Sequence, residues 1–272
     1  MIINGKSSLV RIARKSLARA GVINPFRGLF KEIEFETLTY CNRKCTYCPN
    51  VDYERFGEAE NFFMQEDVFT TLIDQLVDLK FEGELAPHLY GEPMADPRLS
   101  QWMAYIRKKL PACKIKIVTN GDFLDEASYS ELINSGIDYF VISKHGEKFK
   151  KGFRMLYEKL SEEERNNRLI VRDFFDNFSK DQSMINTRGG EVAVERSVEK
   201  KQPVNCVYAT YPVINVFGEL VLCCQDYKSN YVFGNIAERH LRDLWFDPNN
   251  IAIRRRIFQS HFDLEICQKC YM

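Results

Sequence analysis

The sequence predicts an α/β protein: a partial (β/α)6 barrel of the TIM type, followed by a small C-terminal domain with a β-hairpin and a helix. Two observations predict it. Between residues 33 and 175, apolar strand-like runs alternate with amphipathic helical stretches, an order typical of a parallel sheet with right-handed crossovers. After residue 175 the alternation stops, and two β-rich runs joined at Gly218-Glu219 indicate a hairpin.

The barrel is expected to contain five or six strand–helix units. Strands are predicted at Ile33–Thr39, Glu84–Leu89, Lys114–Thr119, Asp138–Ser143 and Arg168–Phe174. Helices are predicted at Gln65–Leu79, Arg98–Leu110, Glu126–Ser135 and Gly152–Glu164. Asp96-Pro97 supplies a cap and a first-turn proline, and Gly136 is suited to end a helix. Ligands of such barrels bind at the loops that follow the carboxyl ends of the strands.

The C-terminal hairpin is predicted to pair Tyr211–Phe217 with Leu220–Cys224, because glycine at position 218 supplies the positive φ that a tight turn needs. A helical segment is predicted from His240 through Ile257. The chain is therefore divided into three parts: a helical extension over 1–30, the barrel core over 31–180, and a linker with the C-terminal domain over 181–272.

The composition is that of a soluble globular protein, with 45% hydrophobic and 28% charged residues among 272. Lysine plus arginine and aspartate plus glutamate both number 38, so no net field favours nucleic acid. No apolar run reaches the ~20 residues that span a bilayer, and a basic N-terminal helix is expected to pack on the barrel rather than on a membrane. Nine cysteines without a secretion signal favour the cytoplasm and metal ligation.

Three closely spaced cysteines, Cys41, Cys45 and Cys48, directly follow the first predicted strand. Thiolates held this close can converge on one iron–sulfur cubane, in which three protein ligands leave one iron open. A zinc site and a disulfide are the alternatives that the spacing alone leaves open.

With Tyr47 directly before the third cysteine, the triplet resembles that of the radical S-adenosylmethionine (SAM) superfamily. The resemblance implies a [4Fe-4S] cluster on Cys41, Cys45 and Cys48, whose open iron chelates the amino and carboxylate groups of SAM. It also implies reductive cleavage of SAM to a 5′-deoxyadenosyl radical, and an electron donor such as flavodoxin or ferredoxin.

Further residues resemble the SAM-contacting positions of that superfamily. Gly91 and Glu92 follow the second strand, in a sequence similar to the Gly-Gly-Glu motif with Tyr90 in place of the first glycine. Glu92 suits the cationic amino group of SAM; an ordinary capping or surface glutamate is the alternative. Asn120, at the end of the third strand, is expected at the ribose or methionine moiety, although Asn-Gly is also a plain turn signal. Tyr47 completes the predicted cofactor-binding set.

Five cysteines lie in the C-terminal part: Cys206, Cys223, Cys224, Cys267 and Cys270. Their spacing fits a zinc ribbon as well as an iron–sulfur site. Beside the first triplet they resemble the twitch form of the SPASM extension of radical SAM enzymes. Three motifs add to this: Cys223-Cys224-Gln225-Asp226, Gly234-Asn235-Ile236 and Leu244-Trp245. The resemblance implies one auxiliary [4Fe-4S] cluster on four thiolates: Cys206, Cys223, Cys267 and Cys270. Cys224 is expected on the opposite face of its strand.

Catalytic residues are expected at the carboxyl ends of the later strands. His145 follows the fourth strand and suits acid–base work near neutral pH. Arg172 lies near the end of the fifth, where a guanidinium can grip a carboxylate or hydroxyls. Cys224 and Cys113 are the candidate hydrogen-atom donors, although Cys113 is most simply a small buried hydrophobe.

By resemblance to small twitch-type dehydrogenases, the protein is expected to be a radical SAM oxidoreductase. Its expected substrate is a small polyhydroxylated molecule, sugar- or aminocyclitol-like, that is oxidised at a carbinol. Epimerisation and modification of a ribosomal peptide are the alternatives within the superfamily. A zinc-stabilised binding protein is the contrasting class. The sequence indicates neither the exact substrate nor the oligomeric state.

Overall fold

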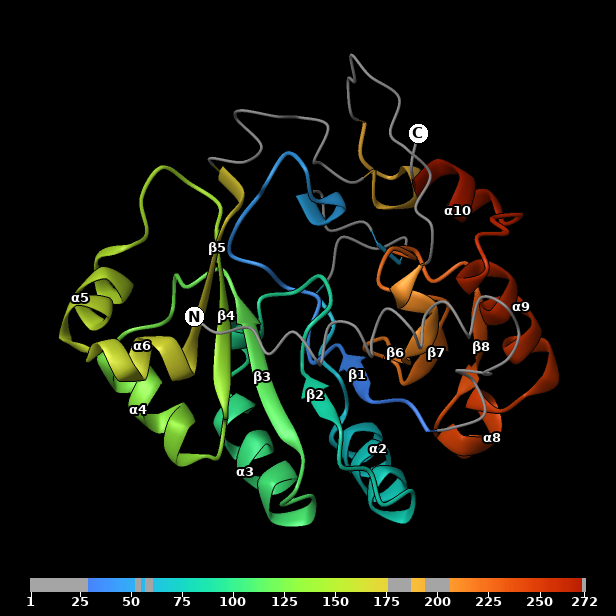
Figure 1. Cartoon of the computed structure of the whole chain (residues 1–272), viewed down its shortest axis with the longest axis horizontal. Coiled ribbons are helices and arrows are strands. Elements are labelled where there is room, and N and C mark those ends of the chain that lie inside the picture. Colours follow the sequence, from blue (N-terminus) through green and yellow to red (C-terminus); the bar gives the residue numbers. More distant parts are fainter. Residues whose placement is uncertain (1–28, 52–54, 57–60, 176–186, 194–205, 271–272) are drawn as a thin grey trace, which may run out of the picture.

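The computed structural model describes residues 29–51, 55–56, 61–175, 187–193 and 206–270. These residues form one open sheet of eight strands, in the order β5-β4-β3-β2-β1-β6-β7-β8, with helices packed along it (Figure 1). The mixed architecture and the open sheet confirm the predicted partial barrel. The helical extension predicted over 1–30 lies outside the described residues, except for its last two.

Six strands run parallel to one another: β1 (Glu32–Phe35), β2 (Glu84–Ala86), β3 (Lys114–Thr119), β4 (Tyr139–Lys144), β5 (Leu169–Asp173) and β6 (Val213–Ile214). The five strands predicted in the barrel are confirmed. The first two are shorter than predicted, because the chain leaves the strand after Phe35 to enter the cysteine loop and leaves the second strand after Ala86.

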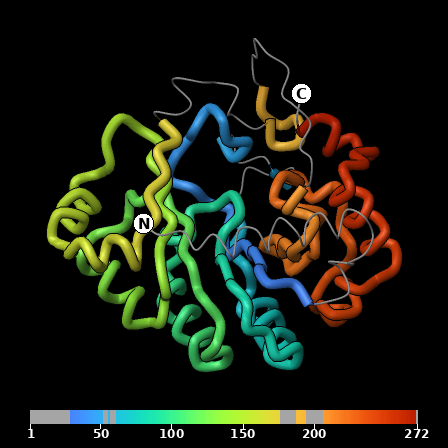
Figure 2. Tube along the Cα trace, viewed as in Figure 1, coloured from blue at the N-terminus to red at the C-terminus, as the bar shows by residue number. Residues whose placement is uncertain are grey.

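The C-terminal hairpin extends the barrel sheet and forms no sheet of its own. Its first strand, β6, pairs in parallel with β1, and β7 (Glu219–Val221) then returns antiparallel to β6. Both strands are shorter than predicted. Gly218 turns the chain with φ +83°. β8 (Val232–Asn235), which was not predicted, adds one more antiparallel strand. Figure 2 shows these late strands directly beside the early strand β1.

Helices follow the strands of the barrel: α2 (Glu66–Asp78), α3 (Leu99–Lys109), α4 (Glu126–Asn134), α5 (Lys151–Lys159) and α6 (Glu162–Arg168). The stretch predicted as one helix over 152–164 is two helices, because Ser161 caps a new one in a capping box with Glu164. Short 3₁₀ helices lie in the connections: η1 (Pro49–Val51), η2 (Pro93–Ala95), η4 (Arg188–Gly190) and η5 (Val207–Thr210).

The C-terminal helical segment is likewise divided, into α8 (Leu241–Trp245) and α9 (Pro248–Phe258), because Asp247 caps the second helix and a proline starts it. The terminal Cys-x-x-Cys lies in a further helix, α10 (Glu265–Cys270), which was not predicted. No helix among the described residues is both long and apolar enough to cross a membrane.

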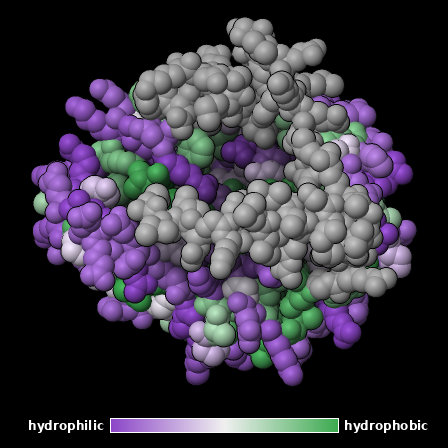
Figure 3. All heavy atoms as spheres, viewed as in Figure 1, coloured by the Kyte–Doolittle hydropathy of each residue, from purple (hydrophilic) through white to green (hydrophobic). Residues whose placement is uncertain are grey.

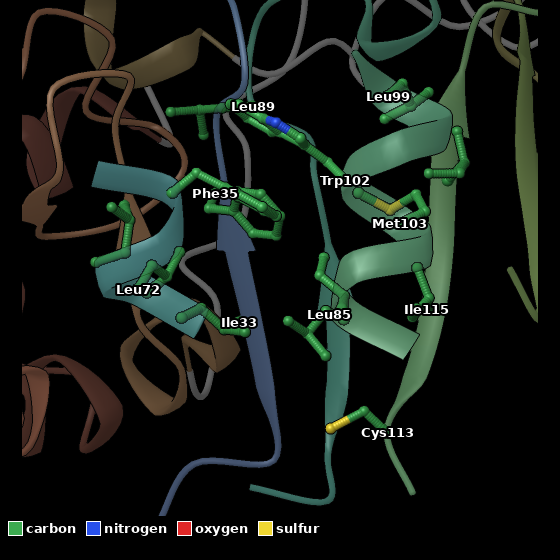
Figure 4. Packing of buried hydrophobic residues seen from close by; sticks show 14 of the residues in the cluster. Ile33, Phe35, Leu72, Leu85, Leu89, Leu99, Trp102, Met103, Cys113 and Ile115 are labelled. Carbon is green, nitrogen blue, oxygen red and sulfur yellow. The ribbon is translucent and has the colours of Figure 1, made fainter. Parts of the chain in front are cut away.

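The hydrophobic core lies between the sheet and the helices that follow its strands (Figure 4). Ile33 and Leu85 belong to this core, and Phe69 of α2 stacks on Trp102 of α3 with ring centroids 4.0 Å apart. Cys113 is buried here and donates its S–H to a backbone carbonyl over 2.9 Å, as expected of a small buried side chain. The opposite, inner face of the strands carries polar side chains.

Candidate active site

The first cysteine loop lies at the carboxyl edge of the parallel strands, directly after β1. Its three thiols are partly buried. Burial, reinforced by the charges of Glu92, Cys48 and Cys45, raises the pKa of Cys41 to about 12. Three thiols so placed give up their protons together only to a strong cation. The donor set therefore fits a metal group.

The arrangement of the cysteines bears on two of the alternatives, the disulfide and the zinc ion. The structure joins none of the nine cysteines in a disulfide. In the part of the chain that the structure describes, no group of three or more histidine, cysteine, aspartate or glutamate side chains is placed to hold a single metal ion.

Gly91 holds the loop after β2 against the cysteine loop. A Cβ at this position would lie 2.0 Å from the Leu38 carbonyl oxygen, so no side chain fits. The close approach allows the Glu92 N–H to donate to the Tyr40 carbonyl over 2.8 Å. Glycine is thus required for the packing that positions the chain directly before Cys41.

The Glu92 carboxylate joins this loop to the end of β3. It accepts hydrogen bonds from Thr119 Oγ1 (2.6 Å), the Asn120 N–H (2.9 Å) and the Met94 N–H (3.1 Å). Burial nevertheless raises its pKa to about 7. A carboxylate has about four acceptor positions, so one remains for a cationic ligand. Because the residue is buried, it is no surface glutamate; it does cap the short helix η2.

A polar network ties the cysteine loop to the loop after β3. Asn120 Nδ2 donates to Asn42 Oδ1 over 2.8 Å, and Asn42 Nδ2 donates to Asp122 Oδ2 over 2.8 Å. Arg43 grips both oxygens of Asp122, at 2.5 and 2.7 Å. Burial alone would raise the pKa of Asp122, but the hydrogen bonds from Arg43 outweigh it and the pKa is lowered. The residues directly after Cys41 are thus held by the end of β3.

Tyr47 and His145 meet above the carboxyl edge of the sheet. The tyrosine oxygen lies 2.8 Å from His145 Nδ1, and the imidazole stacks on Phe174. Burial lowers the pKa of His145 to about 4 and raises the pKa of Tyr47, so a neutral imidazole and a neutral phenol share this hydrogen bond. This environment favours an orienting role for His145 over the expected proton exchange near neutral pH.

The inner face of the sheet carries a group of charged and hydroxyl side chains. Lys116 is paired with Glu32, and its Nζ lies 2.8 Å from Glu84 Oε1. Tyr139 donates to Glu84 Oε2 over 2.6 Å. Arg172 is exposed. Its register partner in β4 lies four residues beyond Tyr139, and residues an even number of positions apart on a strand share a face, so Arg172 belongs to the same face as Tyr139.

Two polar residues that the sequence analysis did not single out lie on this face as well. Glu34 of β1 is 3.4 Å from the Tyr211 hydroxyl, and burial, reinforced by Glu32, raises the pKa of Glu34 to about 7. Burial lowers the pKa of His88 to about 3, and its Nδ1 has no hydrogen-bond partner among the described residues. Glu34 lies between the buried Ile33 and the next apolar residue of the strand. This alternation in the sequence could have predicted that the Glu34 side chain points to the inner face.

The second cysteine set divides between two hydrophobic clusters, although Cys223 and Cys224 follow the end of β7 and do not lie on a strand as predicted; Cys224 is in a turn. Cys206, Cys223 and Cys267 pack against one small hydrophobic cluster in the C-terminal part. The negative charge of an ionised Cys270 raises the pKa of both Cys206 and Cys267, which indicates that the three residues lie near one another. Cys224 instead packs against the barrel core, where burial, followed by the charge of Glu34, raises its pKa.

Arg188 is a further residue whose position the sequence analysis missed. Its charge acts on the pKa values of residues from both halves of the chain: Glu34, Cys48, His88 and Cys224. The guanidinium therefore lies near residues of both cysteine sets and of the barrel. It follows a long polar stretch, so no local pattern in the sequence could have placed it there.

Comparison with known proteins identifies both halves of the chain. A family model described as the radical SAM superfamily matches residues 35–164, and one described as an iron–sulfur cluster-binding domain, SPASM, matches residues 206–271. The S-adenosyl-L-methionine-dependent 2-deoxy-scyllo-inosamine dehydrogenase of Niallia circulans is 30% identical over 244 residues, which are 89% of this chain and 93% of that protein. The chain belongs to the radical SAM superfamily.

Two solved structures share the fold of this radical SAM protein. BtrN in complex with AdoMet and 2-DOIA has a TM-score of 0.78 at 29% identity, over 90% of this chain and 94% of that one. BtrN in an open conformation has a TM-score of 0.67 at 24% identity, with the same coverage. The superfamily and the SPASM match imply SAM, a SAM-binding [4Fe-4S] cluster and an auxiliary cluster. This protein is therefore an enzyme.

Proposed function

We propose that this radical SAM enzyme oxidises a carbinol of a small polyhydroxylated substrate, of the aminocyclitol class, to a ketone. The observation that carries the proposal is the place of Glu34: a carboxyl on the inner face, with a raised pKa, beside the Tyr211 hydroxyl and near Cys224. The relative from Niallia circulans is named as a dehydrogenase of such an aminocyclitol. It matches this chain over nearly its whole length, which supports the same class of substrate here.

The residues that would hold the cofactors follow from the site. The SAM-binding cluster is assigned to Cys41, Cys45 and Cys48, and SAM to the surroundings of Tyr47, Gly91, Glu92 and Asn120. The auxiliary cluster is assigned to Cys206, Cys223, Cys267 and Cys270. The first three pack on one hydrophobic cluster, and the charge of Cys270 acts on the pKa of Cys206 and Cys267, which supports the assignment. When bound, these groups supply the radical that takes the substrate's hydrogen atom and an acceptor for the electron left behind. The proposed barrel core then spans 31–180, and the linker with the auxiliary domain spans 181–272.

The protein's own side chains bind the substrate hydroxyls. Lys116 and Tyr139 are donors, Glu84 is an acceptor, and His88 Nδ1 is buried without a partner among the described residues. The hydroxyls of a polyol, which both donate and accept hydrogen bonds, can therefore bond to these donors and acceptors. Arg172, exposed on the same face, is assigned to a further hydroxyl at the rim.

The proton of the oxidised hydroxyl also needs an acceptor. Oxidation of a carbinol releases a hydrogen atom, an electron and the hydroxyl proton. Glu34 accepts that proton, because a carboxyl with a pKa of about 7 suits a base at neutral pH. His145, whose pKa is lowered to about 4, keeps the orienting role through Tyr47.

The test uses enzyme that is purified and reconstituted without oxygen. With SAM, a reductant and 2-deoxy-scyllo-inosamine, we expect 5′-deoxyadenosine and a ketone in equal amounts. Deuterium at the reacting carbon should appear in the 5′-deoxyadenosine. Glu34→Gln should lower ketone formation by roughly 100-fold while SAM binding stays intact, as for loss of a catalytic base. SAM cleavage that no aminocyclitol or sugar stimulates would refute the proposal.

Epimerisation is the second candidate, and the place of Cys224 favours it. The charge of Glu34 acts on the pKa of this thiol, and the charge of the thiol acts on the pKa of Tyr208, so the thiol lies near the inner-face carboxyl. A thiol there could return a hydrogen atom to a substrate radical. In deuterated water, an epimerase would place solvent deuterium at the product carbon, and Cys224→Ala would abolish it. A dehydrogenase would form its ketone in both proteins.

An external electron donor of the flavodoxin or ferredoxin class is part of the proposal, because reductive cleavage of SAM consumes one electron. The proposed location is the cytoplasm, since a reducing compartment keeps thiols free for iron–sulfur ligation. A zinc-stabilised binding protein is not supported, because the chain belongs to an enzyme superfamily whose cysteine pattern it carries.

A further inference from the structure

The chain as a whole is electrically neutral, but one segment of it is strongly basic. Between Lys144 and Arg154 there are five cationic side chains and one carboxylate, whereas the whole chain has 38 of each sign. Lys144 is partly buried and paired with Asp173. Figure 3 shows mostly hydrophilic side chains on the side of the molecule that carries α4–α6. Four of the five cations are exposed: Lys148, Lys150, Lys151 and Arg154.

The basic segment lies against the first cysteine loop. His145 contacts Tyr47 over 2.8 Å, and a Cβ on Gly146 would lie 3.6 Å from Arg43 Nη1. Lys150 Nζ lies 3.5 Å from the carboxylate that Arg43 grips. The cysteine loop is therefore packed beside this segment of the chain.

The cysteine loop adds its own exposed residues to this surface. Lys44 and Thr46, on either side of Cys45, are exposed. Phe123 lies in the loop after β3 with 40% of its surface exposed. That loop contacts the start of α5, since a Cβ on Gly152 would lie 3.7 Å from a carbonyl oxygen of the loop. Exposed cations and one apolar side chain thus lie on the loop that carries Cys45 and on the segments that pack beside it.

We propose that this basic surface, formed by Lys44, Lys148, Lys150, Lys151 and Arg154, is the docking site of an acidic one-electron carrier protein. The inference rests on the proposed function, which requires an external electron. The carrier class is that of flavodoxins and small iron–sulfur ferredoxins. The carrier loses one electron and the cluster proposed on the first cysteine loop gains it; no bond forms or breaks.

Charge and position favour this partner over others. Electron-transfer encounters use small interfaces that opposite charges steer together, so they need a compact basic surface and little apolar area. The surface also lies beside the loop whose thiols would hold the acceptor. An anionic membrane would also attract these lysines. Membrane binding, however, does not explain why the lysines lie beside Cys45. Membrane binding is therefore an outcome that the test must separate.

The test begins with a triple variant of the reconstituted enzyme, Lys44→Glu, Lys148→Glu and Lys151→Glu, which leaves Lys150 and its contact with Asp122 in place. Binding of a bacterial flavodoxin is measured by calorimetry at low and high salt. Reduction of the cluster by flavodoxin hydroquinone is followed in a stopped-flow spectrometer.

The matched control is a second triple variant, Lys31→Glu, Lys108→Glu and Lys114→Glu. These three lysines are exposed and lie at the amino-terminal edge of the strands, away from the cysteine loop. The control changes the net charge by the same amount as the first variant. It therefore separates the position of the charges from their number.

For the first variant we expect flavodoxin binding at low salt to weaken by roughly 10- to 100-fold, with a similar loss in the rate of cluster reduction. Reduction by photoreduced 5-deazaflavin, a small reagent that needs no docking surface, should stay as in the wild type in both variants. Equal losses in the control variant, or wild-type binding in the first, would overturn the proposal. So would binding of the wild type to phosphatidylserine vesicles but not to flavodoxin.

The result is separable from that of the proposed function. If flavodoxin reduces the cluster and SAM is cleaved, but no aminocyclitol or sugar is oxidised, the docking site is supported and the proposed substrate class is refuted. If the ketone forms with 5-deazaflavin but flavodoxin neither binds nor reduces the enzyme, the proposed substrate class is supported and the docking site is refuted.

Discussion

Arg55 and Glu36 form an ion pair that is buried between the two cysteine-bearing parts of the protein. Arg55 Nη1 lies 2.5 Å from one carboxylate oxygen and 2.6 Å from the other, and both side chains are at most 2% exposed. Arg55 Nε also donates to the Tyr227 carbonyl. The guanidinium carbon lies 4.9 Å from the ring centre of Tyr90 and 5.3 Å from that of Tyr227.

The same tyrosines cross-link the two cysteine loops. The Tyr90 hydroxyl donates to the Cys224 carbonyl over 2.6 Å. The Tyr227 hydroxyl donates to Asn50 Oδ1 over 3.2 Å, and Asn50 Nδ2 donates to the Thr39 carbonyl over 2.8 Å. The chain just after the first cysteine loop is therefore bound to the chain just after Cys224. The distance between the two cysteine sets is determined by buried polar contacts as well as by the shared sheet.

The first prediction concerns this ion pair. Arg55→Met should destabilise the protein by about 3–5 kcal/mol, because it leaves the Glu36 carboxylate buried without its partner. The free energy of unfolding of the metal-free protein, from urea titration, measures this. The double variant Arg55→Met with Glu36→Gln should recover much of the loss. Lys109→Met, which breaks an exposed pair with Asp74, should leave stability nearly unchanged. Equal effects of Arg55→Met and Lys109→Met would contradict the buried pair.

The sequence predicted the parts of the fold that local patterns determine. The barrel strands and the helices α2–α4 each have a clear period, a cap or a glycine stop, and all were found. The break at Ser161 was missed, because the helical period of 152–164 is uninterrupted; the capping box with Glu164 was the available signal. β8 was missed since Gly234 interrupts a short run whose pairing depends on β7.

The site was predictable to a similar extent. The first three cysteines were recognisable because the ligands of a cluster lie close in sequence. Arg55 and Arg188 were not, since each acts on residues far along the chain: Glu36 and Tyr227 for the first, Cys224 for the second. A residue whose role depends on tertiary contacts of this kind leaves no spacing to find.

The second prediction concerns Gly91. In Gly91→Ala the new Cβ would lie 2.0 Å from the Leu38 carbonyl oxygen, so the loop must move and the Glu92–Tyr40 hydrogen bond must lengthen. We expect a loss of stability of about 1–3 kcal/mol, as for overpacked sites, and at least roughly tenfold weaker SAM binding in calorimetry of the reconstituted enzyme. Gly146→Ala is the matched control, because its nearest atom would be 3.6 Å away. SAM affinity that is equal in both variants would separate this loop from the SAM site.

The third prediction uses the raised pKa of Glu34, about 7 in the folded protein against an ordinary value of 4.5. Between these two pH values the folded state binds more protons than the unfolded state, so this residue makes stability fall as pH rises from about 4.5 to about 7. Below that range its effect vanishes. Above it the penalty is constant, at most on the order of 3 kcal/mol and smaller where solvent screens the carboxylate. Glu34→Gln should remove this part of the slope.

Urea titrations of the metal-free protein from about pH 5 to about pH 8 measure the effect, since this range brackets the titration of Glu34. Glu92, whose pKa is also raised to about 7, adds a slope of the same sign, so the difference between wild type and Glu34→Gln is the quantity to compare. The variant should gain stability relative to the wild type at the upper end of the range and little at the lower end. A difference that does not change with pH would show that Glu34 titrates normally.

The last prediction is the iron content of cysteine variants, which tests the assignment of both clusters. Two [4Fe-4S] groups give about eight irons per chain after reconstitution. Replacing Cys41, Cys45 and Cys48 by alanine should leave about half, with sulfide to match. Cys113→Ala is the control and should keep all the iron, because this thiol is buried in the core and bonded to the Phe81 carbonyl.

In the second cysteine set, Cys224→Ala decides which of two adjacent thiols is the ligand. The Cys224 thiol packs on the barrel core, whereas Cys223 packs in the same small cluster as Cys206. Cys224→Ala should therefore keep all the iron, and Cys223→Ala should lose the half that belongs to the auxiliary cluster. Loss of half the iron in Cys224→Ala, with none lost in Cys223→Ala, would exchange the two roles. It would also place the auxiliary cluster on the inner side of the sheet and remove Cys224 as a hydrogen-atom donor, because a thiolate bound to iron has no S–H to give.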